Sequence, residues 1–454
     1  MKTRALLMAL TLIVSAAALT SCGSADNSAA DSSISAGGEF GMGGEAVNGD
    51  ASPALEAALD DAGEAAPAEA EAGEADLSGD MLAVKDAEIG ADDEDGAVVD
   101  VPDIAEETEP DPDEDIIPDN GGEAFVLTAG EWNDNENWGF FSNIVSNGTI
   151  SFPQYGLDPT HRVAVNLTNG GEPVRNKKVE LKDGDTTMWS AVTDKEGNAY
   201  LFTPATAKVE YTVVAEGAEP VTVTMGGENE EGQGTGIESP ELSIETGDST
   251  VSYDKTQVMF ILDTTGSMGD EIAYLQKDFT SIAEEVGGND VTFSVNFYKD
   301  KGDDYVTSCN DFTDDIKSVQ KLLNKERASG GGDTPEAVAE ILDETMNSSG
   351  WESDSNKIAF LIFDAPPHSD TEQVIMGAIA KAAEQGIKLV PVVASNADRE
   401  TELFGRAAAI MTGANYVFLT DDSGVGGSHL EPIIGAYDVE LLHDIIVRNI
   451  TELK

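Results

Sequence analysis

Residues 253–454 alternate between short apolar runs and segments with apolar residues at every third or fourth position. The runs are typical of strands buried on both faces of a sheet, and they cover 258–263, 291–298, 358–364, 389–394 and 416–419. The other segments predict helices with one apolar face, and they cover 270–286, 314–327, 336–346, 371–385, 402–411 and 439–453. Alternating strands and helices predict a Rossmann-like α/β domain, with a mainly parallel sheet and helices on both faces.

A different pattern precedes this domain. Residues 123–226 hold short runs in which apolar and polar residues alternate, separated by turn signals such as Asn-Gly and Asp-Gly. Several short strands at this spacing predict an all-β sandwich module. We expect Trp132 and Trp138 to pack against this sandwich. The residues between the two domains, 227–252, are rich in Gly, Glu and Ser and are predicted to be a linker.

The amino-terminal residues 1–21 are typical of a secretory signal peptide, because Lys2 and Arg4 precede an apolar run that is short for a membrane-spanning helix. The tetrapeptide Leu-Thr-Ser-Cys that ends at Cys22 resembles the lipobox of bacterial lipoproteins. The resemblance implies cleavage before Cys22 and lipidation of its sulfur and its new amino group. Several acyl chains would anchor the chain stably to a membrane. The expected location is the bacterial cell envelope, on the extracytoplasmic side or the cell surface.

Acidic residues dominate the next segment and limit what the chain can bind. Residues 22–122 hold about 30 Asp and Glu residues against one basic residue, Lys85, which predicts a disordered linker. The whole chain has 87 acidic and 25 basic residues and a net charge of −62, which argues against nucleic acid as a partner. There are two cysteines in total, and lipidation of Cys22 would leave no disulfide framework.

Oxygen-bearing side chains gather where the predicted strands of the α/β domain end. The first strand ends in Asp263, Thr265 and Ser267 follow it at alternate positions, a Gly-rich loop carries Thr334, and a later strand ends in Asp364. Because open α/β sheets bind ligands beyond the carboxyl ends of their strands, we expect these residues to converge. Hard oxygen ligands with few carboxylates favour Mg²⁺, with Mn²⁺ or Ca²⁺ as alternatives. Taken alone, Asp-x-Thr-x-Ser is also typical of a helix N-cap.

The span 257–453 strongly resembles the von Willebrand factor A domain with its metal-ion-dependent adhesion site. That family has the pattern Asp-x-Ser-x-Ser, a loop Thr and a later Asp. The sequences Gly-Gly-Gly-Asp-Thr-Pro-Glu and Asp-Ala-Pro-Pro-His are most similar to its hemicentin-like branch. The resemblance implies that the ion is held, in part through water, by Asp263, Thr265, Ser267, Thr334 and Asp364. It also implies that a partner's carboxylate completes the coordination. Thr265 stands where Ser is commoner, but it keeps the oxygen.

The predicted sandwich resembles the carboxypeptidase-regulatory or prealbumin-like module over about 50 residues, which implies a structural or binding role. The expected function of the whole chain is adhesion or protein–protein interaction, in which Mg²⁺ binds a protein or glycan ligand. The alternative is a non-adhesive assembly or chaperone subunit that docks onto an ATPase, although a lipid anchor outside the cytoplasm argues against it. We expect no enzyme, because the matched site has no general base beside a metal-bound water. A nucleotide site is also not expected, because no Gly-Lys-Ser/Thr follows the glycine run.

Overall fold

The computed structural model describes residues 126–204, 209–225, 237, 239–288, 290–332, 334–424 and 427–453. All of them belong to one of the two units of the chain, residues 110–454. The predicted signal peptide (1–21), Cys22 and the predicted acidic linker (22–122) lie outside the described residues, so these three assignments stay predictions. Among the described helices, none combines the length and the hydropathy that crossing a membrane requires.

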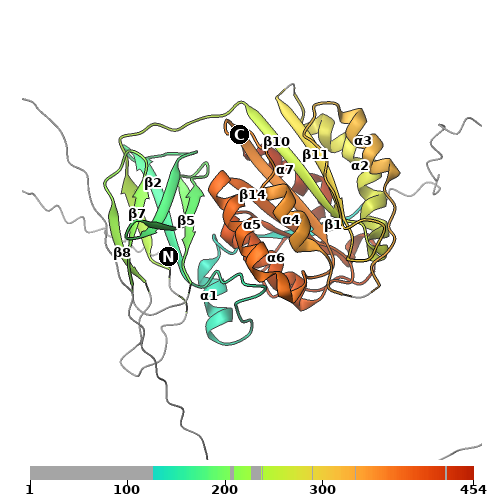
Figure 1. Cartoon of the computed structure of the whole chain (residues 1–454), viewed down its shortest axis with the longest axis horizontal. Helices are drawn as coiled ribbons and strands as arrows, with labels where there is room; N and C mark the ends of the chain where they lie inside the picture. Colours follow the sequence, from blue (N-terminus) through green and yellow to red (C-terminus); the bar gives the residue numbers. More distant parts are fainter. Residues whose placement is uncertain are drawn as a thin grey trace, which may run out of the picture. The chain divides into compact units, whose positions relative to one another are not determined.

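An eight-stranded sheet forms the centre of the α/β domain, in the order β12-β11-β10-β13-β14-β15-β1-β16 (Figure 1). Five strands run parallel: β10 (Lys255–Asp263), β11 (Val291–Tyr298), β13 (Ser355–Phe363), β14 (Ile387–Val393) and β15 (Tyr416–Thr420). Three short strands pair antiparallel: β12 (Thr307–Ser308), β1 (Thr128–Trp132) and β16 (Glu440–Leu441). The predicted mainly parallel sheet is therefore confirmed.

Helices cover both faces of this sheet. Successive side chains of each strand point to opposite faces, so each strand contributes to two apolar cores. Val258, Phe260 and Leu262 of β10 lie in one apolar core with α2 (Gly269–Val286), α3 (Ile316–Lys325) and α7 (Leu442–Thr451). Met259 and Ile261 lie in the opposite core with α4 (Val338–Met346), α5 (Glu372–Gln385) and α6 (Arg399–Thr412). The buried strands therefore read as unbroken apolar runs, which is why their sequence pattern was so clear.

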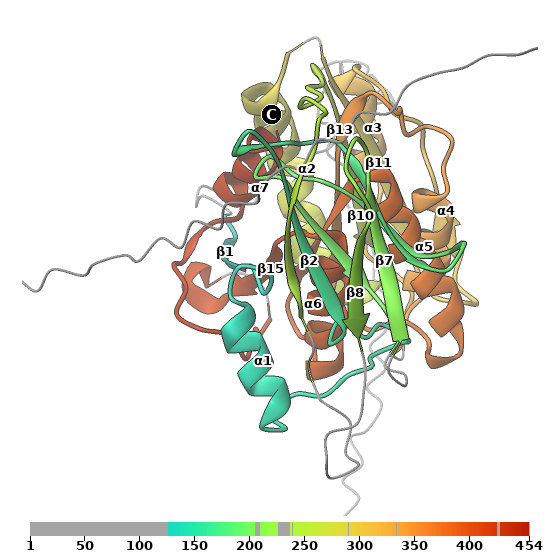
Figure 2. The same ribbon diagram turned by 90° about the vertical axis from the view of Figure 1, so that its left-hand side faces the viewer.

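The β-module, residues 162–245, consists of two four-stranded sheets. One contains β2 (Arg162–Asn169), β3 (Glu172–Pro173), β6 (Asn198–Phe202) and β9 (Glu241–Glu245); the other contains β4 (Lys178–Asp183), β5 (Thr186–Val192), β7 (Val209–Ala215) and β8 (Val221–Met225). The rings of Trp189 and Phe202, one from each sheet, pack edge to face at 5.4 Å. Figure 2 looks onto this module, with the α/β domain behind it. The Val192 side chain of β5 packs against Gly386 at the end of α5.

Two predicted domain boundaries need correction. Strand β1 lies in the range assigned to the sandwich, yet it pairs with β15 of the α/β domain, which buries Ala129. Strand β9 lies in the predicted linker 227–252, yet it pairs parallel with β2 inside the β-module. Both strands have only five residues, and an alternating pattern specifies which face is buried but not which strand is the partner.

The two tryptophans that were expected to pack against the sandwich lie in different places. Trp132 is the last residue of β1, and its ring packs against Phe140 and Gly435, away from the β-module. Trp138 opens α1 (Trp138–Ser146) and stacks under the guanidinium of Arg162 in β2, 3.6 Å from the ring centre. The expectation is therefore wrong for Trp132 and holds for Trp138 through a cation–π contact.

Candidate metal centre

A pocket of about 280 Å³ opens at the carboxyl edge of the parallel strands. It is lined by Thr265, Gly266, Ser267, Gly330, Gly331, Gly332, Thr334, Glu336, Asp364, Ala365 and Asn396. Four of the five side chains predicted to hold a metal thus share one pocket, although they come from three separate segments of the chain. The fifth, Asp263, lies beneath the pocket as the last residue of β10 and is fully buried. Their role as ligands stays a prediction.

Asp263 orients the hydroxyl of Thr265. Its Oδ1 accepts hydrogen bonds from the Thr265 backbone N–H at 2.9 Å and from Thr265 Oγ1 at 2.7 Å. Because that hydroxyl donates its proton to Asp263, its lone pairs stay available to a cation in the pocket. The Ser267 hydroxyl lies 3.4 Å from Thr265 Oγ1. The second carboxylate oxygen, Asp263 Oδ2, is buried and accepts no hydrogen bond of acceptable geometry, although the Tyr298 hydroxyl lies nearby.

The carboxylates at this edge favour a positive charge between them. Burial, followed by the Asp364 charge, raises the pKa of Asp263 to about 7, while the hydrogen bonds from Thr265 act in the opposite direction. Burial also raises the pKa of Asp364 to about 6; a hydrogen bond from Ser267 lowers this pKa, and the charge of Glu271 raises it. Two buried carboxylates destabilise each other's ionised form unless a cation offsets the repulsion.

The glycine run lets a loop lie directly over Thr265. Gly331 has a φ of +70°, and a Cβ at this position would meet Thr265 Cβ at 3.1 Å and Glu336 Oε1 at 3.0 Å. Its backbone N–H donates to Asp303 Oδ2 at 2.8 Å, which holds the loop in place. A side chain at residue 331 would therefore be both strained and crowded. Of the predicted loop motif, Asp333 lies outside the described residues.

Glu336 is a functional candidate that the sequence analysis missed. It was predicted to begin a helix, but α4 begins at Val338, and the Glu336 backbone N–H donates to Pro366 O at 3.0 Å, beside Asp364. Its side chain lines the pocket, is 4% exposed, and has an Oε2 with no hydrogen-bond partner. Burial, followed by the charge of Asp263, raises the pKa of Glu336 to about 8. A Glu after Pro at a helix start is so common that it gave no separate signal.

The donor set fits a small hard cation. Within the described part of the chain, no group of three or more His, Cys, Asp and Glu side chains is arranged to hold a metal. Hydroxyls, one or two carboxylates and water suit Mg²⁺ better than they suit zinc or copper. One buried oxygen at the pocket, Glu336 Oε2, has no hydrogen-bond partner and is a group that an ion or its bound water would satisfy.

Residues 257–426 match the family model of the von Willebrand factor A domain. The chain therefore contains such a domain, as the sequence resemblance implied, and we refer to the α/β domain as the A domain below. The match does not extend to the β-module, whose resemblance to prealbumin-like modules stays a prediction.

Two individual proteins are similar to part of this chain, one in sequence and one in structure. A protein of Acanthamoeba polyphaga mimivirus, described as an ariadne-like RING finger protein, is 32% identical over 114 residues, which cover 24% of this chain and 11% of that protein. The chain therefore spans only about a tenth of that protein's length. Among solved structures, the conserved hypothetical protein BatB from Bacteroides thetaiotaomicron matches 38% of this chain and 91% of its own, with 16% identity and a TM-score of 0.30.

Proposed function

We propose that this chain is a membrane-anchored extracytoplasmic protein whose A domain binds a carboxylate-bearing protein or glycan partner through Mg²⁺. A von Willebrand factor A domain by itself supports a general role in protein interaction or adhesion. One observation carries the finer proposal. Thr265, Ser267, Thr334 and Asp364 line a single pocket, above the buried Asp263 carboxylate that orients Thr265.

In this proposal the chain's own residues hold the ion and leave it accessible. Asp364 and the hydroxyls of Thr265, Ser267 and Thr334 would face the ion, and Asp263 would act from below by orienting Thr265. Ser267 and Thr334 are exposed, so the site opens to solvent on the side where a partner would arrive. A bound Mg²⁺ would supply a coordination position for the partner's Asp, Glu or acidic sugar.

The proposal assigns binding to this pocket and no catalysis. The sequence argument against an enzyme was the absence of a general base, and Glu336 is a carboxylate at this pocket that the argument did not include. Turnover of an ester or peptide by the wild-type chain, lost in Asp364→Ala, would therefore contradict the proposal.

Metal binding is tested first, with the purified full chain. Isothermal titration with MgCl₂ should give saturable binding to the wild type and to Asp311→Ala, in which an exposed aspartate outside the pocket is removed. Asp263→Ala should lose this binding, because Thr265 loses the carboxylate that orients it. Equal Mg²⁺ affinity in the two variants would overturn the proposed metal site.

The partner is tested next by affinity capture from cells of the source organism in MgCl₂. Proteins or glycans that elute with a chelator, and that Asp263→Ala does not retain, are the expected partners. The Asp311→Ala variant should retain them. Capture that is indifferent to Mg²⁺, to the chelator and to Asp263→Ala would contradict the proposed mode of binding. Fractionation of the cells tests the anchor, because Cys22→Ala should move the chain from the membrane to a soluble fraction.

A further inference from the structure

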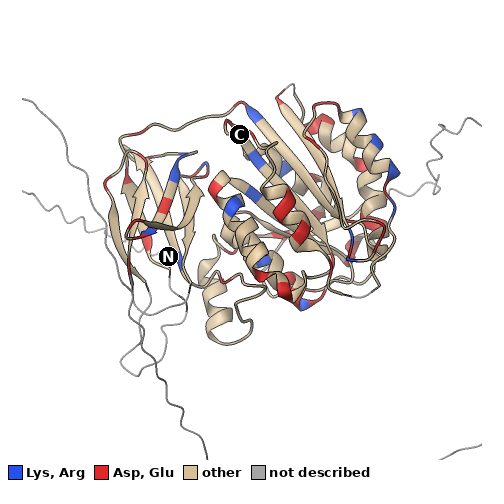
Figure 3. Ribbon diagram, viewed as in Figure 1, with Lys and Arg blue, Asp and Glu red and all other residues tan. Residues whose placement is uncertain are grey.

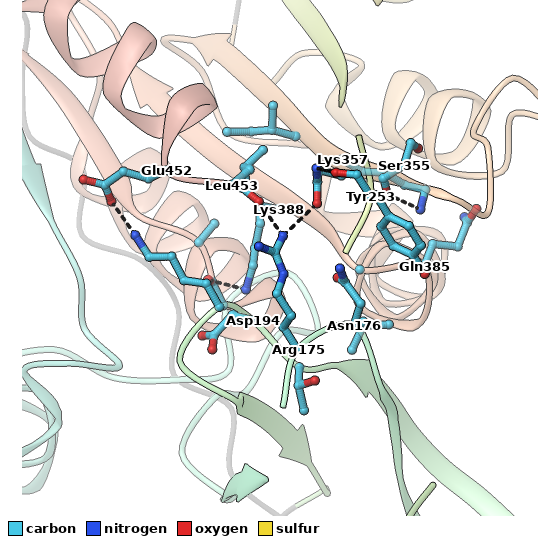
Figure 4. A pocket seen from close by; sticks show the side chains of 18 of the residues that line it. Arg175, Asn176, Asp194, Tyr253, Ser355, Lys357, Gln385, Lys388, Glu452 and Leu453 are labelled. Atoms are coloured by element: carbon cyan, nitrogen blue, oxygen red, sulfur yellow. Dashed lines mark hydrogen bonds and ion pairs between the residues drawn. The ribbon is translucent and has the colours of Figure 1, made fainter. Parts of the chain in front are cut away.

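A second pocket, of about 660 Å³, lies at the opposite end of the parallel strands, between the A domain and the β-module (Figure 4). Its volume is in the range of small-molecule binding sites. One wall is formed by residues at the amino ends of β13 and β14, and another by the segments that flank β4 and β5. Basic positions gather at the end of the large sheet that faces the β-module, as Figure 3 shows.

Lys357 in β13 is the most informative residue of this pocket. Its side chain is buried, with the whole residue 7% exposed, and its ammonium donates one hydrogen bond, to Ser355 O at 3.1 Å. It forms no ion pair with any described carboxylate, and burial lowers its pKa, although the charge of Asp354 acts in the opposite direction. An ammonium has three donors, and a buried charge costs free energy unless it is paired. Lys357 therefore has unused capacity to bind an anion.

Two further cationic groups line the same pocket. The Lys388 ammonium in β14 donates to Gly413 O at 2.9 Å and likewise forms no ion pair with a described carboxylate. Arg175 comes from the β-module and donates to Asn356 Oδ1 at 3.0 Å and to Leu453 O at 2.7 Å. Figure 4 shows its side chain extending from the β-module toward β13 and the end of the chain. Three cationic side chains from three segments thus reach one pocket.

The lysines at the rim of the pocket form ion pairs, unlike Lys357 and Lys388. Lys178 and Lys195 are partly exposed at the rim, and they pair with Glu384 at 3.3 Å and with Glu452 at 3.2 Å. The chain has 87 acidic residues against 25 basic ones, so a lysine readily finds a carboxylate. Lys357 and Lys388 form no such pair with a described carboxylate, and both line the pocket.

Carboxylates among the lining residues limit the kind of ligand. Two of them are Glu136 and Asp194, and burial, followed by the charges of Glu196 and Asp194, raises the pKa of Glu136. These carboxylates repel extended polyanions. The pocket suits a small molecule that has one anionic group for Lys357 and hydrogen-bond donors for the carboxylates.

We propose that the pocket between the A domain and the β-module binds a small anionic molecule, whose carboxylate or phosphate contacts Lys357, Lys388 and Arg175. The anion would accept the hydrogen bonds that the Lys357 ammonium does not otherwise donate. Because the pocket lies at the amino end of the strands, binding there does not require the ion proposed at their carboxyl end. The ligand would also contact both domains and so stabilise their packing.

The test uses the purified full chain with no divalent cation added, so that an anion cannot bind through the metal centre. Inorganic phosphate and succinate are titrated separately, each against sodium chloride of equal ionic strength, by calorimetry and by thermal unfolding. At least one of them should bind saturably and raise Tm. Lys357→Met should weaken that binding at least tenfold. Lys321→Met, which removes the same charge from an exposed position on α3, should change it less than twofold.

Lys357→Met should itself fold, because it replaces a buried charge with an apolar side chain of similar length. If it does not fold, Lys388→Met provides the same test at a less buried position, with the same expected loss. Binding of phosphate alone or of succinate alone supports the proposal and identifies the anionic group. Binding of neither anion above the chloride control overturns it, and so does an equal loss in Lys321→Met.

Discussion

Asp263 and Thr265 lie at the centre of the proposed metal site. One carboxylate oxygen of Asp263 accepts both the N–H and the O–H of Thr265, and the other is left buried without a hydrogen bond. A threonine serves here as well as a serine would. Its hydroxyl is oriented by the hydrogen bond that it donates to Asp263, and its methyl group is buried with the rest of the residue. The sequence predicted these residues because strand ends are recognisable from local pattern alone.

Glu336 needed the structure, and it leads to the first prediction. Glu336→Gln keeps the size of the side chain and removes a carboxyl group that would ionise beside a bound cation. If the proposed ion binds there, its affinity should fall about tenfold, as for other groups that act beside a metal through its bound water. Calorimetry with MgCl₂ measures this change. Glu344→Gln removes a charge from an exposed position on α4 and should leave the affinity unchanged. Equal affinities in the two variants would exclude Glu336 from the site.

Strand β1 joins a sheet whose other strands lie far along the chain. Gly130 lies opposite Phe418 in β15, and a Cβ at Gly130 would come within 2.4 Å of the Phe418 ring and 2.7 Å of the Tyr437 ring. The φ of Gly130 is not in the left-handed region, so backbone conformation does not require a glycine here. The close approach of the two rings does. No local signal indicates this requirement, because both aromatic rings are brought there only by the fold.

The second prediction follows from this packing. Gly130→Ala should lower the free energy of unfolding by about 1–3 kcal/mol, the usual cost of overpacking a buried site. Urea unfolding measures the change. Gly139→Ala is the matched control: nothing lies within 4 Å of a Cβ at Gly139, so the effect there should stay within about 0.5 kcal/mol. A Gly130→Ala variant as stable as Gly139→Ala would show that β1 does not pair with β15.

Helices α2 and α7 are joined by a histidine that responds to pH. His443 lies between Asp278 and Glu285, with its Nδ1 2.7 Å from Asp278 Oδ2 and its Nε2 3.0 Å from Glu285 Oε2. Burial lowers the pKa of His443, but the hydrogen bonds and charges of Glu285 and Asp278 outweigh it, so the pKa is raised overall. The protonated ring therefore stabilises the fold below the unfolded pKa of about 6.5. This stability is lost as pH rises through the higher folded pKa.

The third prediction concerns how the stability that His443 contributes changes with pH. His443→Gln should destabilise the chain more at pH 5.5 than at pH 9, by on the order of 1 kcal/mol at most, because Glu285 is exposed. Thermal unfolding at the two pH values measures the difference. Glu285→Gln removes one of the two partners and should reduce the same pH dependence. A larger effect of His443→Gln at pH 9 would contradict this account of the α2–α7 contact.

The described part of the molecule is held together by a buried ionic cluster that links its first described residues to α6. Asp134 accepts two hydrogen bonds from Arg406, with Nε at 2.8 Å and Nη2 at 2.7 Å. Arg406 also donates to Glu402 at 3.2 Å, and Glu402 pairs with Arg399. Asp134, Glu402 and Arg406 are all nearly or fully buried. The A domain therefore depends on residues that precede the β-module in the chain.

The fourth prediction concerns this dependence. Asp134→Ala leaves Arg406 buried with one carboxylate partner fewer, and it should cost about 3–5 kcal/mol of stability, as expected when one partner of a buried ion pair is removed. Asp185→Ala, at an exposed turn of the β-module, should cost less than about 0.5 kcal/mol. Urea unfolding of both variants measures the difference. A small cost for Asp134→Ala would mean that the A domain does not depend on this buried ion pair.

The sequence by itself determined the five parallel strands and the six helices described in residues 253–454, and the strand ends that carry Asp263 and Asp364. It could do so because buried parallel strands and amphipathic helices each leave a periodic pattern within their own length. The left-handed C-caps at Gly386 and Gly413 were equally local, and they confirm the predicted helix ends. The short strand β16 (Glu440–Leu441) was missed, because it lies within the predicted helix 439–453.

Only the tertiary structure decided which distant segments meet. It placed β1 beside β15, brought Glu336 to the pocket that Thr265 and Asp364 line, and brought Lys357 and Arg175 to the pocket between the two domains. The physical reason is common to all three. An alternating or charged segment shows which side chains will be buried or paired, but its partner is selected by packing and electrostatics across the whole fold.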